Sequence, residues 1–185
     1  MRAIPTRLPG LVVVEPVVHQ DARGSFHESF RAGRMAELGI RESWVQDNQA
    51  RSGHGVLRGM HFSVDPGQAK LVRCARGRIV DVVVDIRRGS PTFGQWEAVE
   101  LDDEACRQLY APLGFAHGYC VVSEVADVLY RCSAYYDPAR ERGFAWDDPE
   151  IAIAWPLEDP ELSQRDRDAP PLAAIADAIP FAYPG

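Results

Sequence analysis

The chain has 185 residues, enough for one domain with a sizeable core, and its 46% hydrophobic and 25% charged residues are typical of a folded globular protein. The net charge of −7 disfavours a general nucleic-acid binder, because phosphate backbones are bound by an excess of Lys and Arg. No apolar stretch reaches the roughly 20 residues that span a bilayer, and residues 1–10 lack the apolar core of a signal peptide, so we expect a cytoplasmic protein that binds neither membranes nor nucleic acid.

Short segments rich in Val, Ile, Leu and aromatic residues recur between turn residues, and only residues 34–38 look helical in the first half. Many strands at even spacing predict an all-β fold, an antiparallel sandwich or barrel. The Pro-rich C-terminal third predicts loops and short helices around this body. We expect one domain over residues 1–185, with a loosely packed tail over about 171–185. The expected strands cover residues 11–18, 25–30, 55–62, 70–74, 79–86, 96–101, 108–111, 118–122 and 126–135.

Cysteine and lysine usage is informative in different ways. The four cysteines show no CxxC spacing, which argues against a zinc knuckle or a disulfide framework and favours buried thiols. Of the twenty basic residues, nineteen are Arg and only Lys70 is Lys. Burial can tune an ammonium group, and its compact charge is not replaced by a guanidinium, so Lys70 is a candidate functional residue.

Pro112, Gly114 and His117 form the pattern PxGxxH, which resembles the second motif of the cupin jelly roll. In metal-binding cupins this His joins an earlier HxH pair and a Glu, because a transition metal requires several ligands. Here the corresponding place reads His61-Phe62-Ser63, so only one of the two histidines is present. We therefore expect a cupin-type jelly roll that uses no catalytic metal.

Acid–base chemistry without a metal must rely on side chains, and the candidates are His61, Lys70, His117 and Tyr130. These residues lie on separate expected strands. A barrel brings such residues together, because alternate positions of each strand point inward. The alternative for His61 and Tyr130 is an ordinary core residue whose polar atoms are hydrogen-bonded.

Longer strings of specific composition and order extend over nearly the whole chain. They read DARG at 21–24, VQDN at 45–48, GVLRGMHF at 55–62, QAKLVR at 68–73, SPTFG at 90–94, GFAHG at 114–118, WDDP at 146–149 and LSQRD at 162–166. Together these strings resemble the dTDP-4-dehydrorhamnose 3,5-epimerase family.

This resemblance implies a jelly-roll homodimer that inverts C3 and C5 of a 4-keto-6-deoxyhexose carried on thymidine diphosphate, without a cofactor. It implies that His61 is the base, that Asp166 is its carboxylate partner and that Tyr130 is the acid. The chemistry agrees, because a proton next to a ketone is removed near neutral pH only by a base combined with stabilisation of the enolate oxygen, which Lys70 can provide.

The resemblance also implies a set of substrate-binding residues that grip the diphosphate, the sugar and the thymine. Arginine suits a bidentate contact with phosphate, and Tyr136 is the residue expected to stack on thymine. The alternative for each charged member is a solvated surface position. The set comprises Arg23, Phe26, Glu28, Gln46, Asn48, Arg58, Lys70, His117, Tyr136, Glu141 and Arg165.

Some positions depart from the family pattern. Arg165 stands where Lys is usual, Met60 where Leu is usual, and Ser63 where Gln is frequent. Ser63 follows the expected base by two residues and can reshape the sugar pocket. This leaves open an epimerase that inverts only C3 or only C5, in a secondary-metabolite pathway. Two readings from other classes are a sugar-binding module without turnover and a metal-dependent cupin.

Overall fold

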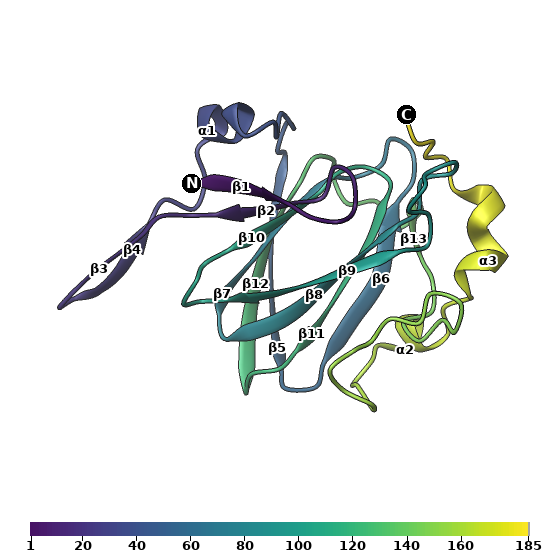
Figure 1. The fold of residues 1–185 in the computed structure, drawn as a ribbon. Coiled ribbons are helices and arrows are strands. Elements are labelled where there is room, and N and C mark those ends of the chain that lie inside the picture. Colours follow the sequence, from purple (N-terminus) through teal and green to yellow (C-terminus); the bar gives the residue numbers. More distant parts are fainter. Residues whose placement is uncertain (185) are drawn as a thin grey trace.

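The computed structural model describes residues 1–184 and consists mainly of two antiparallel sheets that face each other (Figure 1). The predicted all-β jelly roll of the cupin type is confirmed. The six-stranded sheet runs, in spatial order, β1 (Arg2–Pro5), β2 (Val12–Glu15), β10 (Gln108–Ala111), β7 (Lys70–Arg76), β12 (Val125–Cys132) and β5 (Gln46–Gly53). The five-stranded sheet runs β13 (Glu141–Gly143), β6 (Leu57–Ser63), β11 (Phe115–Val121), β8 (Arg78–Asp85) and β9 (Trp96–Asp102).

A third, two-stranded sheet is formed by the hairpin of β3 (Val18–Asp21) and β4 (Gly24–His27). This hairpin projects away from the two large sheets, on the side of the molecule opposite the C-terminal helices (Figure 1). The side chain of Phe26 on β4 is 73% exposed. The hairpin is therefore held to the body only at its base.

The helices are short. They are α1 (Ala32–Glu37), α2 (Gln164–Arg167), α3 (Leu172–Ile175) and the 3-10 turn η1 (Ala176–Ala178). The prediction of one short helix near residues 34–38 and of short helices in the C-terminal third is confirmed. Within residues 1–184, no helix is long and apolar enough to cross a membrane.

Apolar side chains form a core between the two large sheets and one further core on the outer face of each. Strand β8 shows how the pattern arises: Val83 points into the space between the sheets, whereas Val82 and Val84 pack on the outer face against the C-terminal segment. Residues on both faces of the strand are buried because both faces are covered. Asp81 and Asp85 share the inner face with Val83 and have no solvent exposure.

The C-terminal segment packs more tightly than the loose tail expected from about residue 171. Leu172 and Ile179 are 3% and 1% exposed and belong to the core outside the five-stranded sheet. Phe181 accepts a backbone hydrogen bond from Arg88 at 2.9 Å. The many prolines of this region shape its path without preventing burial of its apolar side chains.

Candidate active site

A cavity of about 460 Å³ opens between the two sheets and collects most of the polar side chains singled out above. The residues expected to perform acid–base chemistry all line it, and they come from separate strands, as predicted. They are His61 on β6, Lys70 on β7, His117 on β11, Tyr130 on β12 and, from α2, Asp166.

His61 and Asp166 form a hydrogen-bonded pair, with His61 Nε2 at 2.6 Å from Asp166 Oδ1. Burial alone would raise the pKa of Asp166, but hydrogen bonds from His61, Ser163 and the Gly59 backbone lower it below its usual value. The carboxylate is therefore ionised near neutral pH and can only accept. It follows that His61 donates from Nε2, which leaves the lone pair of the neutral ring on Nδ1.

The chain around Asp166 is fixed to the strand that carries His61. Ser163 caps α2, its Oγ accepting a hydrogen bond from the Asp166 backbone N–H at 3.1 Å. Just upstream, the Glu161 carbonyl accepts from the Leu57 N–H at 3.0 Å, at the start of β6. The segment that leads into α2 and strand β6, which are distant in sequence, are thereby held side by side where His61 and Asp166 pair.

Tyr130 and Lys70 enter the cavity from the six-stranded sheet, opposite His61. Burial raises the pKa of Tyr130 to about 12, so the phenol remains protonated at neutral pH. Burial also lowers the pKa of Lys70, against the attraction of nearby groups that include Glu141 and Asp81. The Lys70 ammonium makes no hydrogen bond or ion pair with any residue between 1 and 184, which leaves its protons free for a ligand.

His117 lies opposite His61 in the β11–β6 ladder, and its Nε2 is 2.8 Å from Asp81 Oδ2. Asp81 was not predicted as a functional residue. Its signal was present in the sequence, since a carboxylate in the apolar strand β8 requires a polar partner when buried. Asp81 fixes the orientation of the His117 ring toward the cavity.

Arg58, Glu141 and Arg165 also line the cavity, in agreement with the prediction. The Arg58 guanidinium donates to Ser52 Oγ from Nε at 3.2 Å and from Nη2 at 3.1 Å. Arg165 forms an ion pair with Glu141. The cavity wall thus carries two guanidinium groups and the Lys70 ammonium beside the carboxylates of Glu141, Glu161 and Asp166. Arg58 and Lys70 form no ion pair with any residue between 1 and 184, so their charges suit an anionic ligand.

Other predicted binding residues lie beside this cavity or away from it. Gln46 and Asn48 do not line it; Gln46 donates to Asn48 Oδ1 at 2.8 Å and accepts from the Tyr136 backbone N–H at 2.9 Å. The Tyr136 side chain is exposed, and the negative charge of Glu141, a residue of the cavity wall, raises its pKa. Arg23 and Phe26 lie on the projecting hairpin.

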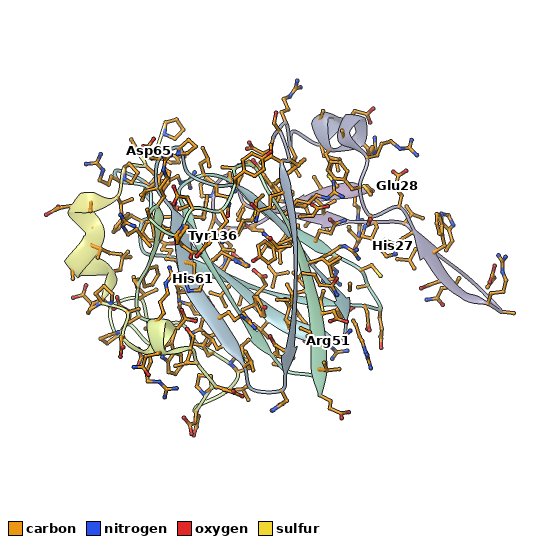
Figure 2. The ribbon with its side chains drawn as sticks, turned by 180° about the vertical axis from the view of Figure 1, so that it is seen from behind. His27, Glu28, Arg51, His61, Asp65 and Tyr136 are labelled. Carbon is orange, nitrogen blue, oxygen red and sulfur yellow. The ribbon has the colours of Figure 1, made fainter. Side chains whose placement is uncertain are left out.

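Glu28 lies just beyond the base of that hairpin (Figure 2), where it accepts from Arg31 Nε at 2.8 Å. Within one chain, Arg23, Phe26 and Glu28 are thus not brought to the cavity.

Across residues 1–184, no group of three or more His, Cys, Asp or Glu side chains is arranged to hold a metal ion. The expectation of a metal-independent reaction stays a prediction.

Comparison with known proteins shows which family the chain resembles over the region that contains these residues. The family model described as dTDP-4-dehydrorhamnose 3,5-epimerase matches residues 5–174. The chain belongs to this epimerase family. The predicted family, isomerase class and epimerase function are thereby confirmed.

Relatives of this epimerase match it over nearly its whole length. A dTDP-4-dehydrorhamnose 3,5-epimerase from Pseudomonas aeruginosa is 46% identical over 183 residues, 98% of this chain and 99% of the relative. The crystal structure of a Legionella pneumophila 3,5-epimerase in complex with dTDP-4-keto-L-rhamnose matches with a TM-score of 0.96 and 46% identity, covering 100% and 99% of the two chains. A dTDP-4-dehydrorhamnose 3-epimerase from Streptomyces niveus is 46% identical over 180 residues, 96% of this chain and 87% of the relative.

Proposed function

We propose that this epimerase acts on a 4-keto-6-deoxyhexose linked to thymidine diphosphate and inverts both C3 and C5, the step that leads toward dTDP-L-rhamnose. One observation carries the proposal. The His61–Asp166 pair projects from one sheet into the cavity that Lys70 and Tyr130 enter from the facing sheet. A sugar ring bound between the sheets has a base on one side and a proton donor on the other.

The reaction begins when His61 removes a proton from the carbon next to the ketone. The electrons of the broken C–H bond move into the enolate, whose oxygen becomes negative, and the Lys70 ammonium stabilises that charge. Asp166 stabilises the imidazolium formed on His61, as a carboxylate on the second ring nitrogen does in other His-based catalysts. Both effects act on charge that is absent in the ground state and so lower the barrier.

Inversion is completed when a proton reaches the same carbon from the opposite side. Tyr130 is the proposed donor, because its phenol is neutral in the free protein and comes from the sheet that faces His61. After donation the tyrosinate recovers a proton from solvent and the His61 imidazolium releases one. The catalyst is restored without any cofactor.

We propose that the diphosphate is bound by Arg58 and Arg165, and that Arg23, Phe26 and Glu28 act from a second copy of the chain. An isolated two-stranded hairpin is marginally stable in water, so the projecting hairpin with its exposed Phe26 is suited to packing on a partner. Each subunit of such a homodimer would consist of a single jelly-roll domain. Sedimentation that found a stable, active monomer at assay concentrations would contradict it.

We propose that the protein works in the cytoplasm. All four cysteines are free and buried, which suits a reducing compartment.

We also propose that no metal takes part in the reaction. Activity that is lost with a strong chelator and restored by one divalent ion would overturn this.

The proposed reaction is tested by incubation with dTDP-4-keto-6-deoxyglucose in heavy water, with the product analysed by NMR and mass spectrometry. A double epimerase incorporates one solvent deuteron at C3 and one at C5, and both centres are inverted. One deuteron with one inverted centre would assign a single-centre epimerase. Binding of the sugar nucleotide without incorporation would instead assign a binding module.

A further inference from the structure

The cavity contains a buried tyrosine hydroxyl for which the reaction above provides no role. Tyr119 of β11 lines the cavity and is 4% exposed. Its hydroxyl has no hydrogen-bond partner among residues 1–184. Burying a polar group without a partner destabilises a protein, and native structures contain few such groups. A hydroxyl retained under these conditions at the wall of a binding cavity points to a ligand.

The β-ladders place this hydroxyl on the functional face of the five-stranded sheet. Tyr119 lies opposite Arg58 on β6 and opposite Asp81 on β8. Residues directly opposite on antiparallel strands share a face, so the three side chains point into the same space. His117 precedes Tyr119 by two residues on that face, and their ring centroids are 6.3 Å apart. Tyr119 therefore lies in the same layer as Arg58, next to the layer of His117 and His61.

The neighbours of Tyr119 have partners of their own. Arg58 donates to Ser52 Oγ, and Asp81 binds His117 through Oδ2, whereas Asp81 Oδ1 is buried without a partner among residues 1–184, like the Tyr119 hydroxyl. Burial raises the pKa of Tyr119, so the phenol is neutral near neutral pH and can donate a hydrogen bond. A ligand that fits must present an oxygen acceptor at this depth of the cavity.

We propose that the Tyr119 hydroxyl donates a hydrogen bond to an oxygen of the bound sugar and is a further substrate-binding residue of this chain. The proposal rests on the proposed function and adds a contact to it. The sugar is assigned rather than the diphosphate because Asp81 Oδ1, opposite Tyr119 on β8, also lacks a partner among residues 1–184. A sugar hydroxyl can accept from the phenol and donate to that oxygen, whereas an ionised phosphate oxygen only accepts.

Tyr110 provides a matched comparison, because it is equally buried but its hydroxyl has a partner. It is 8% exposed, packs on the outer face of the six-stranded sheet, and donates to Glu42 Oε1 at 2.7 Å. It does not line the cavity. Removing the same atom from the two tyrosines therefore separates a ligand contact from a structural one.

The test compares Tyr119→Phe and Tyr110→Phe by thermal unfolding without ligand, by steady-state kinetics, and by calorimetric binding of thymidine diphosphate and dTDP-glucose. We expect Tyr119→Phe to keep or raise Tm and to raise KM and the Kd for dTDP-glucose by about five- to tenfold, the scale of one hydrogen bond. Its Kd for thymidine diphosphate should stay unchanged. Tyr110→Phe should lower Tm and leave KM and both Kd values unchanged.

Three outcomes would overturn the proposal. If Tyr119→Phe lowered Tm as Tyr110→Phe does and left KM unchanged, its hydroxyl would be a structural group. If both ligands lost affinity equally, the contact would be with the diphosphate or the nucleoside. If neither ligand lost affinity, the hydroxyl would not contact substrate. An inactive wild-type protein would refute the proposed reaction alone, because the comparison of the two Kd values would still decide the role of Tyr119.

Discussion

His61 and Asp166 are 105 residues apart in the chain, yet their side chains meet at 2.6 Å in a cavity that neither segment could form alone. Strand β6 carries the proposed base, and the short helix α2 carries its carboxylate partner. A turn of helix capped by Ser163 and tied to the start of β6 fixes their separation. In the proposed mechanism, the activity of His61 therefore depends on the C-terminal segment as well as on the jelly roll.

Asp166→Asn keeps the size of the side chain but removes the negative charge that stabilises the imidazolium. We expect kcat to fall by about 10²–10⁴-fold, the scale of losing a carboxylate partner of a catalytic His. KM should change much less, because the charge acts on the transition state. Asp168→Asn removes the same charge from an exposed position just after α2 and is the control. Equal losses in the two variants would show a general effect of charge and refute a specific pairing.

Gly143 lies opposite His61 in the β13–β6 pair, and a side chain has no room there. An added Cβ would be 2.6 Å from the Met60 carbonyl oxygen and 3.3 Å from His61 Cδ2. Because the first neighbour is backbone, the strand or the His61 ring must move. We expect Gly143→Ala to lower kcat by about 10–100-fold, since small displacements of a catalytic group are costly.

The control for Gly143→Ala is Gly33→Ala in α1, where an added Cβ meets no atom within 4 Å. It should leave kcat unchanged and stabilise the protein by about 0.5–1 kcal/mol, because Ala is the better helix former. Steady-state kinetics and thermal unfolding distinguish the two. Normal kcat in Gly143→Ala would show that the base tolerates movement of its neighbouring strand.

Lys70→Met replaces a half-buried ammonium that has no partner in residues 1–184 with an apolar side chain of similar length. Because burial opposes the charge, the variant should be at least as stable as the wild type. Deuterium exchange and inversion should both fall by about 10²–10³-fold, since the enolate loses its stabilising cation. Arg76→Met, which removes a positive charge from the exposed end of the same strand, should affect neither. A variant that kept full exchange would remove Lys70 from the mechanism.

Much of the fold could be predicted because most strands cover a core on at least one face. Strand β8 and its neighbours show long apolar runs, and the sequence placed them within a few residues. Strands β1, β3, β5 and β13 were not predicted. In β5 the alternate residues Gln46, Asn48, Ala50 and Ser52 face the space between the sheets, and three of these four are polar, so the usual alternation of apolar and polar residues is lost.

The candidates for acid–base chemistry were His61, Lys70, His117 and Tyr130, chosen for their side-chain chemistry, and Asp166, chosen from the family resemblance. The structure places all five around one cavity, while their roles remain predictions. Two structural features could not be predicted from the sequence. The isolation of the Tyr119 hydroxyl depends on what surrounds it in three dimensions. The separation of the hairpin from the cavity depends on the direction in which β3 and β4 leave the body (Figure 1).

The central claim is that His61 and Tyr130 act on opposite sides of the sugar ring, and it is tested most directly by comparing solvent exchange with inversion in two variants. His61→Ala and Tyr130→Phe, each checked for folding, are incubated with substrate in heavy water and followed by NMR. His61→Ala should lose both exchange and inversion, because no enolate forms. Tyr130→Phe should still exchange, because the enolate forms at His61 and is reprotonated from the side it left, while inversion falls by about 10²–10⁴-fold. Loss of exchange in Tyr130→Phe as complete as in His61→Ala, or normal inversion, would contradict this assignment.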